Sequence, residues 1–120
     1  MAKVLVLVDD LFFQAKIMES AKHAGVEVRV FTTPDALLTE IAQHDPKLIV
    51  VDLNARSRPV AALQKIQSSA PNASVVAFLS HVQTELAAEA RAAGCRAVMP
   101  RSQFARDLAT ILAQGKSESS

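Results

Sequence analysis

The sequence contains no tryptophan and no tyrosine, only 3 glycines and a single cysteine, Cys95. One cysteine cannot form a disulfide within the chain, and the absence of a CxxC motif or Cys/His cluster argues against a zinc site. We expect Cys95 to fill a small buried space. The charges nearly balance, with 13 Lys and Arg against 12 Asp and Glu, and they include no long basic run. Direct nucleic-acid binding is therefore not predicted.

Long apolar runs are absent as well. The opening apolar stretch, residues 4–8, is too short to span a membrane, and no signal-peptide cleavage region follows it. We therefore predict a cytoplasmic protein without membrane contact. Because half of the 120 residues are hydrophobic, disorder is excluded and one core can form. We expect a single domain over residues 1–114, followed by a flexible C-terminal tail over residues 115–120.

Short apolar runs alternate along the chain with longer segments of helical spacing. The runs cover residues 4–8, 26–31, 48–51, 75–79 and 97–99. The first, third and fourth are apolar on both strand faces, as expected of a parallel sheet covered by helices on both sides. The second alternates with Glu27 and Arg29, which favours a position nearer the edge of the sheet.

Glycine, proline and capping residues mark where the helical segments begin and end. Gly25 ends the first, Thr33 and Pro34 begin the second, Pro59 leads into the third, Gly94 ends the fourth, and Ser102 is the expected N-cap of the fifth. Five strand–helix pairs with right-handed crossovers predict an α/β fold, a doubly wound (βα)5 sheet of flavodoxin-like type. Of two plausible strand orders, 2-1-3-4-5 places the first run centrally and the second at an edge.

Three acids follow the strands on either side of the expected switch point. Asp9 and Asp10 follow the first run, and Asp52 follows the third. Ligands of open α/β sheets bind beyond the carboxyl ends of the strands, so these side chains should meet there. Three clustered acids repel each other unless a cation joins them, and oxygen ligands favour Mg²⁺, with Mn²⁺ as the alternative. A carboxylate at such a site can attack phosphorus and form an aspartyl phosphate.

These positions resemble the receiver domains of two-component signalling proteins over roughly residues 3–113. The resemblance lies in Val8-Asp9-Asp10, Val51-Asp52-Leu53-Asn54 and Leu79-Ser80. It implies that Asp52 accepts the phosphoryl group and that the metal is held by Asp9, Asp10, Asp52 and the backbone carbonyl of Asn54. It also implies that Ser80 contacts the phosphoryl group during switching.

The end of the fifth strand departs from the receiver pattern. Receivers place a lysine followed by proline there, whereas this chain reads Met99-Pro100-Arg101. Either Met99 or Arg101 can be aligned with the lysine, and strand parity does not decide, because both point to the same face. The need for a cation favours Arg101 as the phosphoryl contact, and its planar fork could clamp Asp52 bidentately.

Two further departures concern the loop after the acceptor strand and the fifth strand itself. The loop carries Arg56 and Arg58 near the acids and lacks the usual proline and glycine. Val98 stands where receivers carry a switch aromatic. Both features weaken the expectation of ordinary switching.

Our leading hypothesis is a stand-alone receiver, monomeric or weakly dimeric, that accepts phosphate on Asp52 from a histidine kinase or phosphotransfer protein with Mg²⁺. It would signal through a downstream protein and would not be an enzyme beyond its own phosphorylation and dephosphorylation. The alternative is a degenerate receiver that acts as a constitutive interaction module. A phosphatase is disfavoured because Asn54 stands where such an enzyme needs a second acid.

Overall fold

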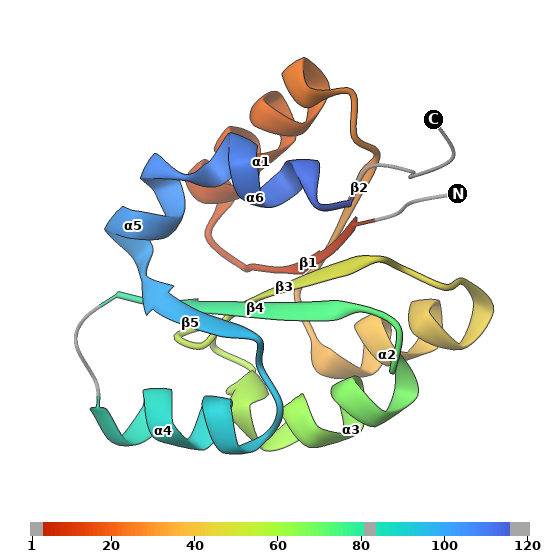
Figure 1. Ribbon diagram of the computed structural model, residues 1–120, viewed down its shortest axis with the longest axis vertical. Coiled ribbons are helices and arrows are strands. Elements are labelled where there is room, and N and C mark those ends of the chain that lie inside the picture. Colours follow the sequence, from red (N-terminus) through yellow and green to blue (C-terminus); the bar gives the residue numbers. More distant parts are fainter. Residues whose placement is uncertain (1–3, 81–83, 116–120) are drawn as a thin grey trace.

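The computed structural model describes residues 4–80 and 84–115 and shows a parallel sheet between two layers of helices (Figure 1). The strands are β1 (Val4–Leu7), β2 (Val28–Phe31), β3 (Leu48–Asp52), β4 (Ser74–Leu79) and β5 (Ala97–Pro100). They pair in parallel in the order β2-β1-β3-β4-β5. The predicted α/β fold and its strand order are confirmed.

The helices divide between the two faces of this sheet. They are α1 (Leu11–Ala24), α2 (Pro34–Gln43), a 3₁₀ helix η1 (Pro59–Ala62) that leads into α3 (Leu63–Ser69), α4 (Thr84–Ala92), α5 (Arg101–Arg106) and α6 (Leu108–Ala113). One face is covered by α1, α5 and α6, and the other by α2, α3 and α4 (Figure 1). None of the described helices is both long and apolar enough to cross a membrane.

Alternate residues of the central strands serve the two halves of the core. In β1, Leu5 and Leu7 pack with the α2–α4 layer, whereas Val4 and Val6 pack with the α1, α5 and α6 layer. Every residue of β1 and β3 is buried. The edge strand β2 instead exposes Arg29. The continuous apolar runs of the sequence thus reflect burial on both faces of the sheet.

The first helix ends as Gly25 predicts. Gly25 adopts the left-handed conformation with φ 70°, and the N–H of Val26 donates to the carbonyl of Ala21 at 2.9 Å. This is the hydrogen bond of a Schellman cap. Val26 is buried as part of that cap, so β2 begins at Val28, two residues later than the apolar run suggests.

We expect Gly25→Ala to lower the free energy of unfolding by about 1 kcal/mol, because a Cβ is disfavoured in the left-handed region. An added Cβ would meet no atom of the described residues within 4 Å, so backbone strain alone should set the loss. Gly25→Asn, which tolerates this conformation better, should cost less. Urea unfolding followed by circular dichroism measures both, and equal losses would contradict this explanation.

The last helical segment differs from its prediction. Ser102 was expected to be the N-cap, which is wrong: α5 begins at Arg101, directly after Pro100. Pro100 keeps an extended conformation, with φ −63° and ψ 152°, and closes β5, so the helix begins at the next residue. The segment is also divided at Asp107 into α5 and α6.

Two smaller expectations concern Cys95 and the C-terminal tail. Cys95 is only partly buried against the α2–α4 layer, and burial raises the pKa of its thiol to about 11. Of the expected tail, Gly115 is buried, and the remaining residues, 116–120, lie outside the described residues.

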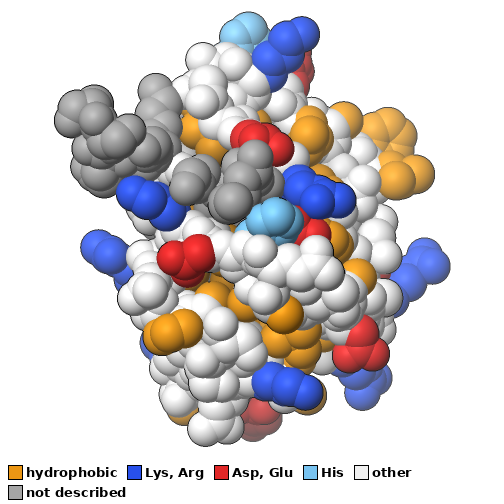
Figure 2. All heavy atoms as spheres, turned by 90° about the vertical axis from the view of Figure 1, so that its right-hand side faces the viewer, with side chains coloured by type: hydrophobic (Ala, Val, Ile, Leu, Met, Phe, Trp, Pro, Cys, Tyr) orange, Lys and Arg blue, Asp and Glu red, His pale blue; other side chains and the backbone are white. Residues whose placement is uncertain are grey.

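The strands begin at one end of the molecule, and this face is shown in Figure 2. Acidic and basic side chains are interspersed there among apolar ones, and the described part of the face carries no patch of a single sign. The polar residues selected from the sequence lie at the other end, where the strands finish.

Candidate functional site

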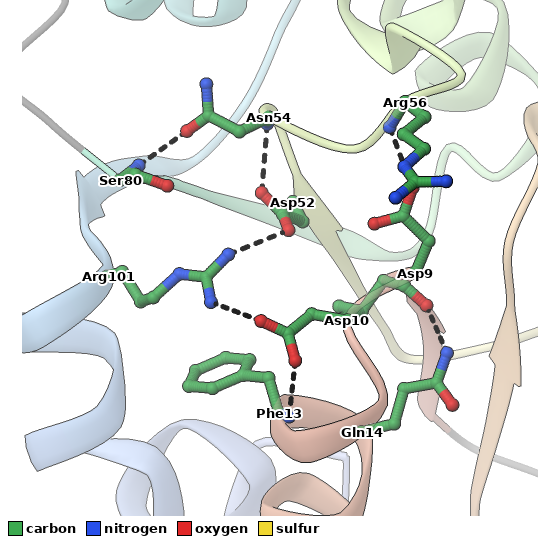
Figure 3. Close-up of polar contacts among 10 residues, drawn as sticks. Asp9, Asp10, Phe13, Gln14, Asp52, Asn54, Arg56, Ser80 and Arg101 are labelled. Atoms are coloured by element: carbon green, nitrogen blue, oxygen red, sulfur yellow. Dashed lines mark hydrogen bonds and ion pairs between the residues drawn. The ribbon is translucent and has the colours of Figure 1, made fainter.

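The carboxyl ends of the strands bring all the predicted site residues to one edge of the sheet (Figure 3). They are Asp9 and Asp10 after β1, Asp52 and Asn54 at the end of β3, Ser80 after β4, and Arg101 after β5. Parallel strands end at the same edge, which explains why residues far apart in the sequence meet here.

Asp52 is the most deeply buried acid of this group, with 1 % of its surface exposed. Its Oδ1 accepts a hydrogen bond from the backbone N–H of Asn54 at 2.9 Å, and its Oδ2 accepts one from Nη2 of Arg101 at 3.1 Å. Burial raises the pKa of Asp52, while the Asn54 hydrogen bond and the charge of Arg101 oppose that rise. Both oxygens are therefore fixed, in a setting that disfavours the charge they carry.

Asp10 has a different position, because it caps α1. Its Oδ1 accepts from the N–H of Phe13 at 3.1 Å, and its Oδ2 accepts from Nη1 of Arg101 at 3.1 Å. The hydrogen bond from Phe13, followed by that from Arg101, lowers the pKa of Asp10. Asp10 and Asp52 are thus shifted in opposite directions although both contact the same guanidinium.

Arg101 joins these two acids. One terminal nitrogen lies 3.1 Å from Asp10 and the other 3.1 Å from Asp52, so the fork spans two carboxylates and does not clamp Asp52 bidentately as expected. The guanidinium carbon lies 4.8 Å from the ring centroid of Phe13 and 5.5 Å from that of Phe78. Met99, the other residue that could be aligned with the receiver lysine, packs against the α1 side of the core.

Asp9 contacts the loop after β3. Its Oδ2 accepts a hydrogen bond from the backbone N–H of Arg56 at 2.8 Å. Arg56 was expected to bring positive charge to the acids. Its hydrogen bond to Asp9 is made by the main-chain N–H and not by the guanidinium (Figure 3). Two residues later Arg58 adopts φ 51°, a strained left-handed conformation that turns the chain into Pro59.

Asn54 and Ser80 link the ends of β3 and β4. The backbone N–H of Ser80 donates to Oδ1 of Asn54, while the backbone N–H of Asn54 donates to Asp52. The side chain of Asn54 therefore connects the two strand ends (Figure 3). The roles predicted for the Asn54 carbonyl and for Ser80 in phosphoryl contact stay predictions.

The predicted divalent metal requires the acidic side chains to converge on one point. Among residues 4–80 and 84–115, no group of three or more His, Cys, Asp or Glu side chains is placed to hold a metal ion. Arg101 holds Oδ2 of both Asp10 and Asp52, and Oδ2 of Asp9 is bonded to the loop. As arranged, these residues do not fit a divalent cation, because the guanidinium supplies positive charge where the metal was expected.

The aromatic support of Arg101 was not foreseen. Phe13, Phe78 and Phe104 come from three different elements, and the rings of Phe78 and Phe104 stack with centroids 4.5 Å apart. Phe13 lies 5.2 Å from Phe78 and 5.8 Å from Phe104. The sequence marks these residues only as apolar, and tertiary packing brings the three rings together and places two of them, Phe13 and Phe78, under Arg101. The one hint in the sequence was that phenylalanine is its only aromatic residue type apart from histidine, so any aromatic cluster had to be built from phenylalanines.

Comparisons with known proteins place the fold. No family model and no curated protein matches the sequence. A response regulator from Burkholderia pseudomallei, described with a phosphorylated aspartic acid, calcium ion and citrate, matches with TM-score 0.82 and 17% identity over 93% of this chain and 66% of that chain. A CheY-like receiver domain protein from Methanospirillum hungatei JF-1 matches with TM-score 0.80 and 19% identity over 90% of this chain and 87% of that chain.

A third match is the beryllofluoride-activated NtrC4 receiver domain dimer, with TM-score 0.79 and 16% identity over 97% of this chain and all of that chain. This chain thus spans just under two thirds of the Burkholderia protein, 87% of the Methanospirillum protein and all of the NtrC4 receiver domain. The chain has the fold of response-regulator receiver domains.

Proposed function

We propose that this chain is a receiver module of two-component signalling, with Asp52 accepting a phosphoryl group from a histidine kinase or phosphotransfer protein. The observation that carries the proposal is the position of Asp52. It ends a central strand of a receiver fold, with Arg101 at one carboxylate oxygen and the N–H of Asn54 at the other. The phosphorylated aspartic acid in the Burkholderia neighbour supports the same chemistry.

In the proposed transfer, a carboxylate oxygen of Asp52 attacks the phosphorus of the donor. The new P–O bond forms as the bond from phosphorus to the donor's nitrogen or oxygen breaks, and the leaving group departs with that electron pair and takes up a proton. Arg101 supplies N–H donors and positive charge for the phosphoryl oxygens. Because Asp52 is 1 % exposed, Arg101 must move aside as the donor approaches.

A divalent metal is a separate part of this proposal. Mg²⁺ or Mn²⁺ would be held by Asp9, Asp10, Asp52 and the backbone carbonyl of Asn54. The calcium ion in the Burkholderia neighbour supports a metal in this fold. In this chain a metal requires Arg101 to release Asp10 and Asp52 and Asp9 to leave the loop. Output through contacts with a downstream protein is likewise proposed, with Ser80 as the residue that senses the phosphoryl group.

The test is phosphorylation by acetyl phosphate, with and without Mg²⁺, followed by intact-protein mass spectrometry. We expect the wild type to gain the mass of one phosphoryl group and to lose it on treatment with hydroxylamine, as an acyl phosphate does. Asp52→Asn, which keeps the size but removes the nucleophile, should gain nothing. Addition of the same mass to Asp52→Asn, or no addition to the wild type in either buffer, would contradict the assignment.

A second candidate is a receiver that acts as a constitutive interaction module without phosphorylation. The double ion pair of Arg101 favours it, because the guanidinium already satisfies both acids in one state. This candidate predicts that neither acetyl phosphate nor beryllofluoride changes the melting temperature or the amide NMR spectrum of the wild type. A spectral change confined to wild type and absent in Asp52→Asn would exclude it.

A further inference from the structure

We propose that Arg101 is a resident counter-cation that competes with divalent metal ions for Asp10 and Asp52. The inference concerns how the site of the proposed function is regulated. Only its biological consequence rests on that function. Metal binding is measured without phosphoryl transfer, so the two proposals can fail independently.

The first support is the placement of charge. Both terminal nitrogens of Arg101 are used, one on each acid, at 3.1 Å in each case. A metal bridging Asp10 and Asp52 would need an oxygen of each acid, and Arg101 already holds Oδ2 of both. A divalent ion and a guanidinium between the same two carboxylates would repel each other across a short distance in a partly buried site. The two cations therefore exclude each other from this position.

The second support is the surface on which the guanidinium lies. It packs over Phe13 and Phe78 at 4.8 and 5.5 Å from the ring centroids. A planar guanidinium stacks on such rings, whereas a lysine ammonium is a compact and strongly hydrated charge. Phe78 and Phe104 are fully buried, so the aromatic surface is a fixed part of the core. Arg101 also starts a helix directly after Pro100, which holds its backbone in place.

The third support comes from Asp9. A site arranged for a metal would direct this acid toward Asp10 and Asp52, but its Oδ2 accepts from the Arg56 N–H at 2.8 Å. Among the described residues the three acids do not converge into a metal-binding group. Arg101 offsets part of the charge of the two acids that it contacts, while Asp9 is held by the loop.

The experiment is Mg²⁺ binding to the whole chain, measured by isothermal titration and by melting temperature, for wild type and Arg101→Gln. We expect the apparent Kd for Mg²⁺ to be at least about tenfold tighter in Arg101→Gln, because the competing cation is gone. Arg101→Lys should fall between the two. Arg106→Gln, which removes an arginine that is 72 % exposed, is the matched control and should bind Mg²⁺ as the wild type does.

Specificity is checked by adding Asp10→Asn to Arg101→Gln, which should abolish the gain. A wild type that binds Mg²⁺ as tightly as Arg101→Gln, or more tightly, overturns the proposal. Should Arg101→Gln fail to fold, Phe13→Leu serves instead, because it loosens the aromatic support and leaves Arg101 present. It should then bind Mg²⁺ more tightly than the wild type by a smaller factor, and unchanged affinity would count against the competition.

Discussion

Phe78→Ala is expected to lower the free energy of unfolding by about 3–5 kcal/mol, the usual range for removing a buried phenylalanine ring. Phe78 lies in the inner strand β4 and is fully buried. Its ring stacks on that of Phe104 with centroids 4.5 Å apart and packs against that of Phe13 with centroids 5.2 Å apart. The truncated side chain therefore leaves a cavity that several elements line. Domains of this size have a total stability of about 5–15 kcal/mol, so the loss is a large part of the whole. Urea unfolding followed by circular dichroism measures it.

Two variants separate this loss from nonspecific effects. Phe78→Leu keeps most of the volume and should cost less than half as much as Phe78→Ala. Phe12→Ala removes the same ring type from a residue that is 91 % exposed and should change stability by no more than about 0.5 kcal/mol. A Phe78→Ala loss below about 1 kcal/mol would show that the three-ring cluster is not a stabilising part of the core.

Much of the fold was predictable because burial leaves a periodic signal. The runs at residues 4–8 and 48–51 are apolar at every position, and they became the two strands that are buried throughout. Arg29 interrupts the second run, and that strand lies at the edge. Helix caps were predictable too, since Gly25 caps the C-terminus of α1 and Thr33 caps the N-terminus of α2, as expected. The prediction of Ser102 as an N-cap was wrong because β5 ends at Pro100 and α5 begins at the next residue, which leaves no room for a serine cap between them.

The site was predictable to the extent that strand ends define it. Asp9, Asp10 and Asp52 could be placed at one edge from the order of the strands alone. What each carboxylate contacts could not be deduced in the same way. Strand parity left Met99 and Arg101 equivalent, and the Arg101 side chain that reaches the acids lies over rings from α1 and β4. Contacts between distant elements leave no periodic trace in a sequence.

Arg101 also changes what the predicted triad implies. Three acids at one edge suggest a divalent cation as the partner that relieves their repulsion. Here a monovalent side chain offsets one of the two charges of Asp10 and Asp52, and a backbone N–H binds Asp9. The repulsion expected from the sequence is thus partly offset within the chain. Both the proposed metal binding and the proposed phosphorylation require Arg101 to leave the acids.

The opposite pKa shifts of Asp52 and Asp10 predict opposite pH profiles for their asparagine variants in buffer containing EDTA. Burial raises the pKa of Asp52 above its ordinary 3.8, so this carboxyl favours folding below that pH and loses its contribution as the pH rises through the raised value. Asp52→Asn removes the penalty on the buried charge. Its melting temperature should exceed that of the wild type near neutral pH, and the difference should close as the pH falls toward 3.8.

Asp10→Asn is the matched control with the opposite sign. The hydrogen bond from Phe13 and the contact with Arg101 lower the pKa of Asp10 below 3.8, so its charge stabilises the fold above that pH and the contribution is lost below it. Asparagine caps helices as well as aspartate does, so the cap of α1 should survive the change. Asp10→Asn should therefore melt below the wild type at neutral pH, with a difference that shrinks only below pH 3.8. If Asp52→Asn also melts below the wild type at neutral pH, pairing with Arg101 outweighs burial, and Asp52 is held as a carboxylate by the same ion pair that holds Asp10.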